Sequence, residues 1–368
     1  MEENNYKVSI ITVSYNSSKT IEQTIKSVLH QTYNNIEYIV IDGLSTDGTQ
    51  QVIEKYIDSI AYFVSEKDNG LYYAMNKGIE KATGDIIGII NSDDWYALYA
   101  VENVVKYFQN NNAELLYGNT IMVAENGEEK SSIGTQSLTG IWWGIPFMHS
   151  SVFVKKHVYE KYGMFDVRYN LASDIDLLLR FYTQKVKFGY INKTIAYFRL
   201  GGLSTKKRKE SLDEAQSIYL NYSKLAPDER RVVEKINQKY AVARFPSEIE
   251  ENHNMLRDLV CKYFNKNIKH IIIFGGGIWG KRCFKVLEST DIEIAYFTDN
   301  NPQKWNTDVC GIKVINPNEL QFLDAYVLIA VMNDSYVIEE QLESMNNNRL
   351  QYVSLKDLME LFCKQQEV

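Results

Sequence analysis

Two hydrophobic periodicities alternate along the first 110 residues. Short apolar runs rich in β-branched residues predict strands over residues 7–13, 36–41, 61–65 and 85–90. Between these runs, apolar residues recur every three or four positions and predict helices over residues 21–29, 49–56, 71–82 and 98–110. Strands that alternate with helices favour a parallel sheet covered on both faces.

The pattern changes twice further along the chain. Residues 113–153 show short strands and loops, which predict an added mixed-sheet region, and residues 173–184 predict a helix. Residues 206–244 are charge-rich and helix-forming, and a second α/β pattern begins at Lys269 with the strand-like run His270–Phe274. We therefore expect a first domain over 1–205, a helical linking segment over 206–265 and a smaller α/β domain over 266–368.

Composition and charge exclude several classes of protein. The 368 residues include 40 Lys and Arg against 47 Asp and Glu, so the net charge of −7 disfavours a general polyanion-binding surface and a nucleic-acid partner. No apolar run approaches the ~20 residues of a spanning helix, and the polar start at residues 1–5 lacks signal-peptide character. The four cysteines form no CxxC pair, which favours reduced thiols in a soluble cytoplasmic protein.

Polar residues follow each of the first four predicted strands. They are Ser14–Asn16, Asp42–Thr49, Glu66–Asp68 and Asn91–Asp94. Ligands of open parallel sheets bind at the carboxyl ends of the strands, so these residues should lie along one edge. Carboxylates and hydroxyls at one edge suit a polar ligand together with a metal ion.

The adjacent carboxylates of Asp93 and Asp94 are the most distinctive feature of this edge. Such a pair repels unless a cation or hydrogen-bond donors compensate, and Mg²⁺ or Mn²⁺ would also bridge a diphosphate. The alternative is capping of the next helix, for which Ser92 and Asp93 are also suited. The residues alone leave both readings open.

These motifs carry a resemblance to a known family. The runs Val8–Asn16, Asp42–Thr49 and Asn91–Asp94 resemble glycosyltransferase family 2, and Ser65–Gly78 resembles its O-antigen and capsule branch. The likeness spans about residues 6–205. It implies a GT-A fold (a Rossmann-like parallel sheet with added mixed strands), a nucleotide-diphospho-sugar donor with a UDP-sugar as first candidate, Mn²⁺ or Mg²⁺, and inversion at the anomeric carbon.

The resemblance also implies roles at the donor site. Tyr15 would lie against the base, Asp42 would accept a hydrogen bond from it, and Asp68 would reach the nucleotide. The alternative for Asp42 is a turn-forming residue, and the alternative for Asp68 is a surface loop carboxylate. Asp93 and Asp94 match the metal and diphosphate motif. Asn91 stands where the family often has aspartate and would bind the ribose or a metal-bound water. The expected donor-binding set is Thr12, Tyr15, Asp42, Asp68, Asn91, Ser92, Asp93, His149 and Arg199.

A carboxylate is also expected as the general base that takes a proton from the acceptor hydroxyl. Asp174 and Asp176 lie at the start of the helix predicted over 173–184, where the helix dipole alone could explain either residue. The resemblance assigns Asp174 to the base position, although Ser173 stands where the family often has glutamate. Asp176 points away by ~200° on a helix, so we prefer Asp174.

Four further residues each have two candidate roles. His149 would contact diphosphate or acceptor, or be a packed side chain, and Trp142 and Trp143 would stack on a sugar or fill the core. Arg199, before the glycines at 201 and 202, would close on the donor phosphates or form a basic hinge.

A second candidate site lies in the C-terminal domain. Gly275, Gly277 and Gly280 fit G-x-G-x-x-G between a strand and a helix, and Asp299 ends the next strand. The span resembles the Rossmann-like domain of sugar-nucleotide-modifying proteins, which implies a nucleotide or NAD as ligand. A scaffold that kept the fold is the alternative, and no Tyr-x-x-x-Lys pair supports dehydrogenase chemistry.

The sequence thus predicts an inverting glycosyltransferase of surface polysaccharide biosynthesis with a saccharide or lipid-linked saccharide acceptor. A peripheral contact with the inner face of the cell membrane through residues 206–209 competes with a solvated helix end. The rival functions are a non-catalytic sugar-nucleotide-binding subunit and an oxidoreductase acting through the second domain. Donor sugar, linkage and oligomeric state stay open.

Overall fold

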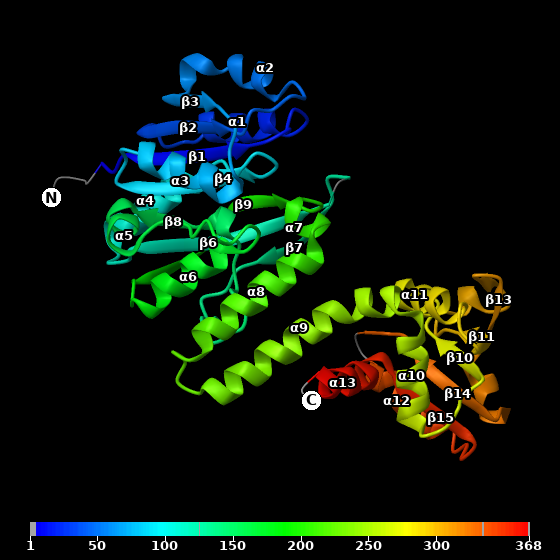
Figure 1. Cartoon of the computed structure of the whole chain (residues 1–368). Helices are drawn as coiled ribbons and strands as arrows, with labels where there is room; N and C mark the ends of the chain where they lie inside the picture. The colour runs from blue at the N-terminus through cyan, green and yellow to red at the C-terminus, as the bar shows by residue number, and fades with distance from the viewer. Residues whose placement is uncertain (1–4, 125, 333–334, 367–368) are drawn as a thin grey trace. The chain divides into compact units, whose positions relative to one another are not determined.

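A nine-stranded mixed sheet forms the centre of the first of two units in the computed structural model, which describes residues 5–124, 126–332 and 335–366 (Figure 1). The units are Met1–Ile236 and Asn237–Val368. The strands of the first unit are β1 Val8–Ser14, β2 Ile36–Asp42, β3 Tyr62–Ser65, β4 Ile86–Asn91, β5 Trp95–Tyr96, β6 Leu115–Val123, β7 Glu129–Ile133, β8 Phe153–Lys155 and β9 Phe188–Arg199. They run in the order β3-β2-β1-β4-β8-β6-β9-β5, with β7 paired to β6.

The first four strands are parallel, as the sequence predicts, and β8 pairs with β4 and β6 in the antiparallel direction. The helices that follow them are α1 Ile21–Leu29, α2 Thr49–Glu54, α3 Leu71–Lys81, α4 Ala100–Asn110, α5 Lys156–Tyr162, α6 Ser173–Thr183, α7 Leu203–Lys206 and α8 Arg208–Ser223, with short 3₁₀ turns η1 Ile57–Ser59 and η2 His149–Ser151. Helix α9, Glu229–Glu251, spans the junction of the two units.

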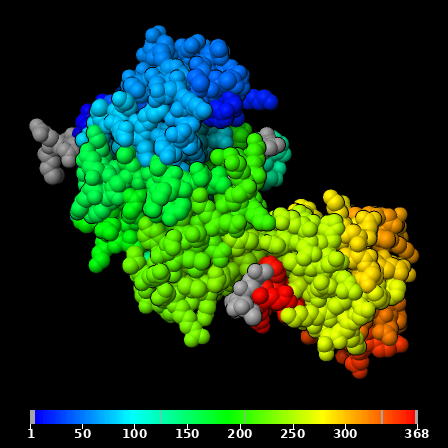
Figure 2. All heavy atoms as spheres, in the orientation of Figure 1, coloured from blue at the N-terminus to red at the C-terminus, as the bar shows by residue number. Residues whose placement is uncertain are grey.

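Two hydrophobic clusters cover the two faces of this sheet. All seven residues of β1 are buried, and the adjacent Ile10 and Ile11 lie in different clusters because neighbouring strand residues point to opposite faces. Helices α3 and α6 pack on one face, and α1 and α4 on the other. Figure 2 shows the first unit, blue to green, as one densely packed body. The predicted arrangement of a sheet with helices on both faces is confirmed.

The second unit has its own sheet of six strands. They are β10 His270–Phe274, β11 Glu293–Thr298, β12 Asp308–Val309, β13 Ile312–Ile315, β14 Ala325–Ile329 and β15 Leu350–Ser354, in the order β12-β13-β11-β10-β14-β15. Every pair is parallel except β12–β13. The helical elements are α10 His253–Phe264, α11 Ile278–Leu287, α12 Ser335–Ser344, α13 Leu355–Gln366, η3 Pro302–Lys304 and η4 Pro317–Phe322.

Clusters of apolar side chains again lie on both faces of the second sheet, with α10, α11 and α13 on one face and α12 and η4 on the other. The second, smaller α/β domain is therefore present. The predicted domain boundaries stay predictions, but α8 from the predicted linking segment packs against α6 within the first unit. Among the described residues, no helix combines the length and the apolar character that crossing a membrane requires.

Candidate functional site

The ends of β1, β2 and β4 lie side by side at one edge of the first sheet. Ser14 is in register with Asp42, and Val13 with Asn91, so the segments that follow these strands start at the same level. We call residues 14–18, 42–49, 65–68 and 91–94 the polar rim. The predicted gathering of polar residues at one edge follows directly from this register.

Side chains tie the segments after β1 and β2 together. Asn16, in the left-handed conformation at φ 51°, donates its N–H to Ser45 Oγ at 2.8 Å and accepts from Thr46 N–H at 2.9 Å. Asp47 accepts from Ser18 N–H at 3.0 Å and from the Thr49 hydroxyl. These bonds give the rim a defined shape before any ligand binds.

Tyr15 is the exposed aromatic residue of the rim, with 66% of its surface accessible. Its ring lies over Gly43, where an added Cβ would be 3.4 Å from Tyr15 Cδ2. A flat exposed ring at the rim is suited to stacking against a base. Thr12 and Ser92 of the predicted donor set are instead buried, bonded to Tyr38 and Ser17.

Asp42 is fully buried, and its carboxylate accepts four hydrogen bonds from within the protein. The donors are the hydroxyls of Ser14 (2.9 Å), Ser45 (2.6 Å) and Ser65 (2.6 Å) and the Ser45 N–H (2.9 Å). These residues come from the ends of β1, β2 and β3. In this structure the Asp42 carboxylate therefore holds three strand ends together and presents no exposed surface to a base.

The segment after β4 brings together Asn91, Asp93, Asp94 and His149. Asn91 Nδ2 lies 3.3 Å from His149 Nε2, which the η2 turn supplies from 58 residues further along the chain. Burial raises the pKa of Asp93 above its ordinary value, while the neighbouring His149 and Arg199 oppose that shift. Burial and the charge of Asp93 raise the pKa of Asp94 well above its ordinary value.

Arg199, at the end of β9, contacts both carboxylate residues of this segment. Its N–H donates to Asp94 Oδ1 at 3.0 Å, and its Nε donates to the Asp93 carbonyl at 3.2 Å. The guanidinium also donates to Gln23 at 2.7 Å and lies 5.1 Å from the centre of the Trp95 ring. Arg199 thus lies at the rim, with its side chain fixed by Gln23 and Trp95.

Two buried oxygens at this position have no hydrogen-bond partner, Asn91 Oδ1 and Asp94 Oδ2. A buried unpaired oxygen is costly and suits a site that a cation or ligand completes. The described residues hold no group of three or more His, Cys, Asp or Glu side chains placed for a metal. Mg²⁺ needs no such cage, because one or two carboxylates and substrate phosphates suffice. The donor set around Asp93 fits such an ion.

Asp68 lies beside Lys77, whose Nζ is 2.7 Å from Asp68 Oδ1 and 2.7 Å from Glu66. The second Asp68 oxygen is buried and unpaired. A lysine between two carboxylates therefore fixes the segment after β3, and the sequence motif gave no sign of this role of Lys77.

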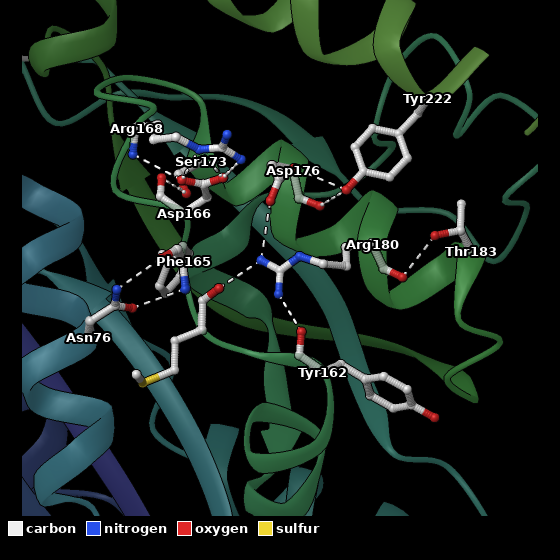
Figure 3. Close-up of polar contacts among 11 residues, drawn as sticks. Asn76, Tyr162, Phe165, Asp166, Arg168, Ser173, Asp176, Arg180, Thr183 and Tyr222 are labelled. Carbon is white, nitrogen blue, oxygen red and sulfur yellow. Dashed lines mark hydrogen bonds and ion pairs between the residues drawn. The ribbon is translucent and has the colours of Figure 1, made fainter. Parts of the chain in front are cut away.

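The two carboxylates of α6 have different surroundings. Asp176 is buried and accepts from Arg180 at 3.2 Å and from the Tyr222 hydroxyl at 3.0 Å, as Figure 3 shows. Asp174 is half-buried and accepts one hydrogen bond, from the Tyr72 hydroxyl at 3.1 Å. Asp176 thus holds α6 in place, whereas the hydrogen bond of Asp174 occupies one carboxylate oxygen, Oδ1.

Two residues around Asp174 were not found by sequence reasoning. Tyr72 of α3 is 102 positions from Asp174, and Glu214 of α8 binds the backbone just before α6. Tyr72 lies in the motif of residues 65–78, but the resemblance assigns it no role, and Glu214 lies in the charge-rich segment predicted to be a helical link. Only the packing of α3 and α8 near α6 brings them to this place.

The glycine turn of the second unit has the expected tight geometry. Gly275 has φ 108°, and an added Cβ at Gly280 would lie 1.8 Å from the Gly275 carbonyl oxygen. Asp299 accepts from Gly276 N–H at 2.8 Å and from Lys304 at 2.7 Å. The Asp299 carboxylate thus closes the turn, and nucleotide or NAD binding at Gly275, Gly277, Gly280 and Asp299 stays a prediction.

Comparison with known families matches two segments of the chain. Residues 9–165 match the model described as glycosyl transferase family 2, and residues 267–351 match the model described as C2185-like, N-terminal. The first match supports the resemblance seen in the motifs of the first unit and includes the rim through Asp94 as well as His149. Asp174 and Arg199 lie beyond it.

Similar proteins include an Escherichia coli enzyme described as UDP-Glc:alpha-D-GlcNAc-diphosphoundecaprenol beta-1,3-glucosyltransferase WfgD, 34% identical over 36% of this chain and 53% of that protein. At 32–34% identity, the chain spans about half the length of the curated relatives it matches. Among solved structures, TarS residues 1–349 of S. aureus in complex with UDP-GlcNAc align with a TM-score of 0.52 and 18% identity, over 68% of this chain and 76% of that one.

The mannosyltransferase PcManGT of Pyrobaculum calidifontis, in complex with GDP-Man and Mn²⁺, aligns with a TM-score of 0.51 and 17% identity over 65% of this chain and 72% of that one. At these identities the likeness is one of fold. With the family match, it confirms the GT-A fold expected for the first unit.

Proposed function

We propose that the first unit transfers a sugar from a UDP-sugar to a saccharide acceptor, with inversion, in the assembly of a surface polysaccharide. One observation carries the proposal: Asn91, Asp93, His149 and Arg199 meet at the rim, beside unpaired buried oxygens of Asn91 and Asp94. The match of residues 9–165 to glycosyl transferase family 2 supports it. The reaction named for the E. coli relative makes UDP-glucose the first donor to test.

Donor binding uses the rim from end to end. The exposed Tyr15 ring stacks on the base, and Asp93 would hold Mn²⁺ or Mg²⁺. A bound divalent ion supplies positive charge that stabilises the leaving diphosphate. His149 and Arg199 orient the diphosphate beside Asp93. Asp42 positions the strand ends that carry Tyr15 and leaves base contact to the surrounding loops.

Asp174 is the general base of the proposed reaction. Its carboxylate takes the proton of the acceptor hydroxyl while the acceptor oxygen bonds to the anomeric carbon and the bond from that carbon to the diphosphate breaks. A single displacement of this kind inverts the configuration. The Tyr72 hydroxyl orients the carboxylate through one of its oxygens and leaves the other for the acceptor.

A lipid-linked saccharide is the proposed acceptor, in line with the diphosphoundecaprenol substrate named for the E. coli relative. Such an acceptor implies work at the inner face of the cell membrane, where residues 206–209 would meet anionic headgroups. A nucleotide or NAD remains the proposed ligand of the second unit's glycine turn.

The test is a transfer assay with the full chain. UDP-, GDP- and dTDP-sugars are offered with and without Mn²⁺ to α-D-GlcNAc-diphosphoundecaprenol, and products are identified by mass spectrometry and NMR of the new linkage. We expect metal-stimulated transfer that Asp174→Asn abolishes and that the exposed control Asp58→Asn retains. Donor binding accompanied by neither sugar transfer nor donor hydrolysis would indicate a non-catalytic subunit. A nicotinamide spectral change with substrate would point to an oxidoreductase.

A further inference from the structure

A single carboxylate binds three backbone N–H groups immediately before α6. Glu214 of α8 accepts hydrogen bonds from the N–H groups of Asn170 at 2.8 Å, Leu171 at 2.6 Å and Ala172 at 2.7 Å. Hydrogen bonds to an ionised acceptor are shorter and about twice as strong as neutral ones. Three consecutive N–H groups on one carboxylate therefore fix the path of this segment.

The anchored segment leads directly to the proposed base. Ala172 is the N-cap residue of α6 and makes no side-chain capping bond of its own, and Asp174 is the second residue of the helix. Glu214, which belongs to another helix, thus binds the backbone at the start of α6 in place of a local capping side chain. Tyr72 of α3 holds the Asp174 carboxylate itself at 3.1 Å.

Other side chains of α8 bind neighbouring segments. The Tyr222 hydroxyl donates to Asp176 one turn or less from Asp174, and the Tyr219 hydroxyl accepts from Ile145 N–H at 2.8 Å. Helix α8 therefore contacts the start of α6, the body of α6 and the segment before His149. It lies outside residues 9–165, the span that matches the family model.

We propose that Glu214 is a positioning residue for sugar transfer: by anchoring the backbone of residues 170–172 it sets where Asp174 meets the acceptor hydroxyl. The inference rests on the proposed function, in which Asp174 is the base. Glu214 acts through the backbone and contacts neither substrate. Its removal should therefore slow the chemical step and leave donor binding as it is.

The experiment compares Glu214→Ala, Glu214→Gln and the control Glu210→Gln in the full chain. Glu210 lies one turn earlier on α8 and is exposed, so its substitution makes the same charge change without touching the segment. Two quantities are measured: transfer from UDP-glucose to α-D-GlcNAc-diphosphoundecaprenol, and hydrogen–deuterium exchange of peptides covering residues 168–176. UDP affinity in the presence of Mn²⁺ is measured alongside.

We expect kcat of Glu214→Ala to fall about 100-fold, the scale of a ~1 Å misplacement of a reacting group, with KM for UDP-glucose unchanged. Glu214→Gln keeps the side-chain length and one acceptor oxygen, so its kcat should lie between Glu214→Ala and wild type. Amides 170–172 should exchange faster in both variants, while peptides of β1 and β4 and the control Glu210→Gln behave as wild type.

Two results would overturn the inference and leave the proposed function standing. One is wild-type kcat in both Glu214 variants while Asp174→Asn is inactive, which would remove the positioning role. The other is a parallel loss of UDP affinity and of protection in β1 and β4, which would make Glu214 a general stabilising residue. If the wild-type chain transfers no sugar from any donor, the positioning role falls together with the proposed function.

Discussion

Replacing Asp42 distinguishes a structural carboxylate from one that binds the donor base. In Asp42→Ala, the hydroxyls of Ser14, Ser45 and Ser65 and the Ser45 N–H all lose their acceptor in a fully buried place. An unpaired buried donor costs about 1–3 kcal/mol, and the three hydroxyls can rotate toward other acceptors. We therefore expect the first unit to lose about 3 kcal/mol of unfolding free energy.

Asp42→Asn provides the graded comparison. Its amide oxygen can still accept hydrogen bonds from the Ser45 N–H and the Ser65 hydroxyl. Its NH₂ group can donate to the Ser14 and Ser45 hydroxyls, which then act as acceptors and no longer as donors. The expected loss is about 1 kcal/mol.

Urea unfolding followed by hydrogen exchange in peptides of β1 and β2 isolates the first unit from the second, and UDP affinity is measured on the folded protein. Tyr15→Ala serves as the control from the same rim. Unchanged unfolding free energy in Asp42→Ala, together with a large loss of UDP affinity, would refute the reasoning and make Asp42 a direct donor contact.

Three further predictions concern Tyr15, Glu37 and the pair Asp174 and Asp176. Tyr15→Ala should weaken UDP binding about fivefold without altering stability, because the ring is exposed and its stacking is worth ~1 kcal/mol; equal affinity measured by calorimetry would argue against base stacking. Glu37 is partly buried, which favours its protonated form, but hydrogen bonds from Lys7, Ser9 and Thr83 lower its pKa to about 2. A lowered native pKa gives stability that is present above the ordinary value and lost as pH falls toward 2, so wild type should lose about 2 kcal/mol between pH 5 and pH 2 that Glu37→Gln does not lose in acid unfolding curves. Asp176→Asn breaks a buried pair with Arg180 and should destabilise the first unit by about 3 kcal/mol, whereas Asp174→Asn should leave thermal unfolding unchanged; equal melting temperatures for the two variants would contradict the division of roles between them.

Local pattern predicted most of the first sheet. The apolar runs of β1, β2 and β4 are buried on both faces and bounded by turn residues. The hydrophobic pattern together with these turn residues is therefore enough to find the strands. β9, which carries Arg199, was missed because exposed Asn192 and Lys193 interrupt its alternation, and its pairing with β6 is a long-range choice. β15 was likewise missed, since its strand identity depends on pairing with β14.

The part of the site that lies in sequence motifs could be predicted. The register of β1 with β2 and β4 places Asn91 and Asp93 at one edge, and a strand-and-turn reading already implies this. The burial of Asp42 could not be seen, because it depends on Ser14 at the end of β1, Ser45 after β2 and Ser65 at the end of β3 converging on one carboxylate. Tyr72 reaches Asp174, and Glu214 reaches the backbone just before α6, only through the packing of helices far apart in the chain.

The central claim is that the polar rim holds a nucleoside diphosphate through a divalent cation bound by Asp93. Isothermal titration of UDP into the full chain, with and without Mn²⁺, tests it for wild type and Asp93→Asn. We predict that Mn²⁺ tightens UDP binding of the wild type by about tenfold or more, a gain of ~1.4 kcal/mol, and that this gain disappears in Asp93→Asn. Equal tightening by Mn²⁺ in both proteins, or no binding of UDP to either, would contradict it.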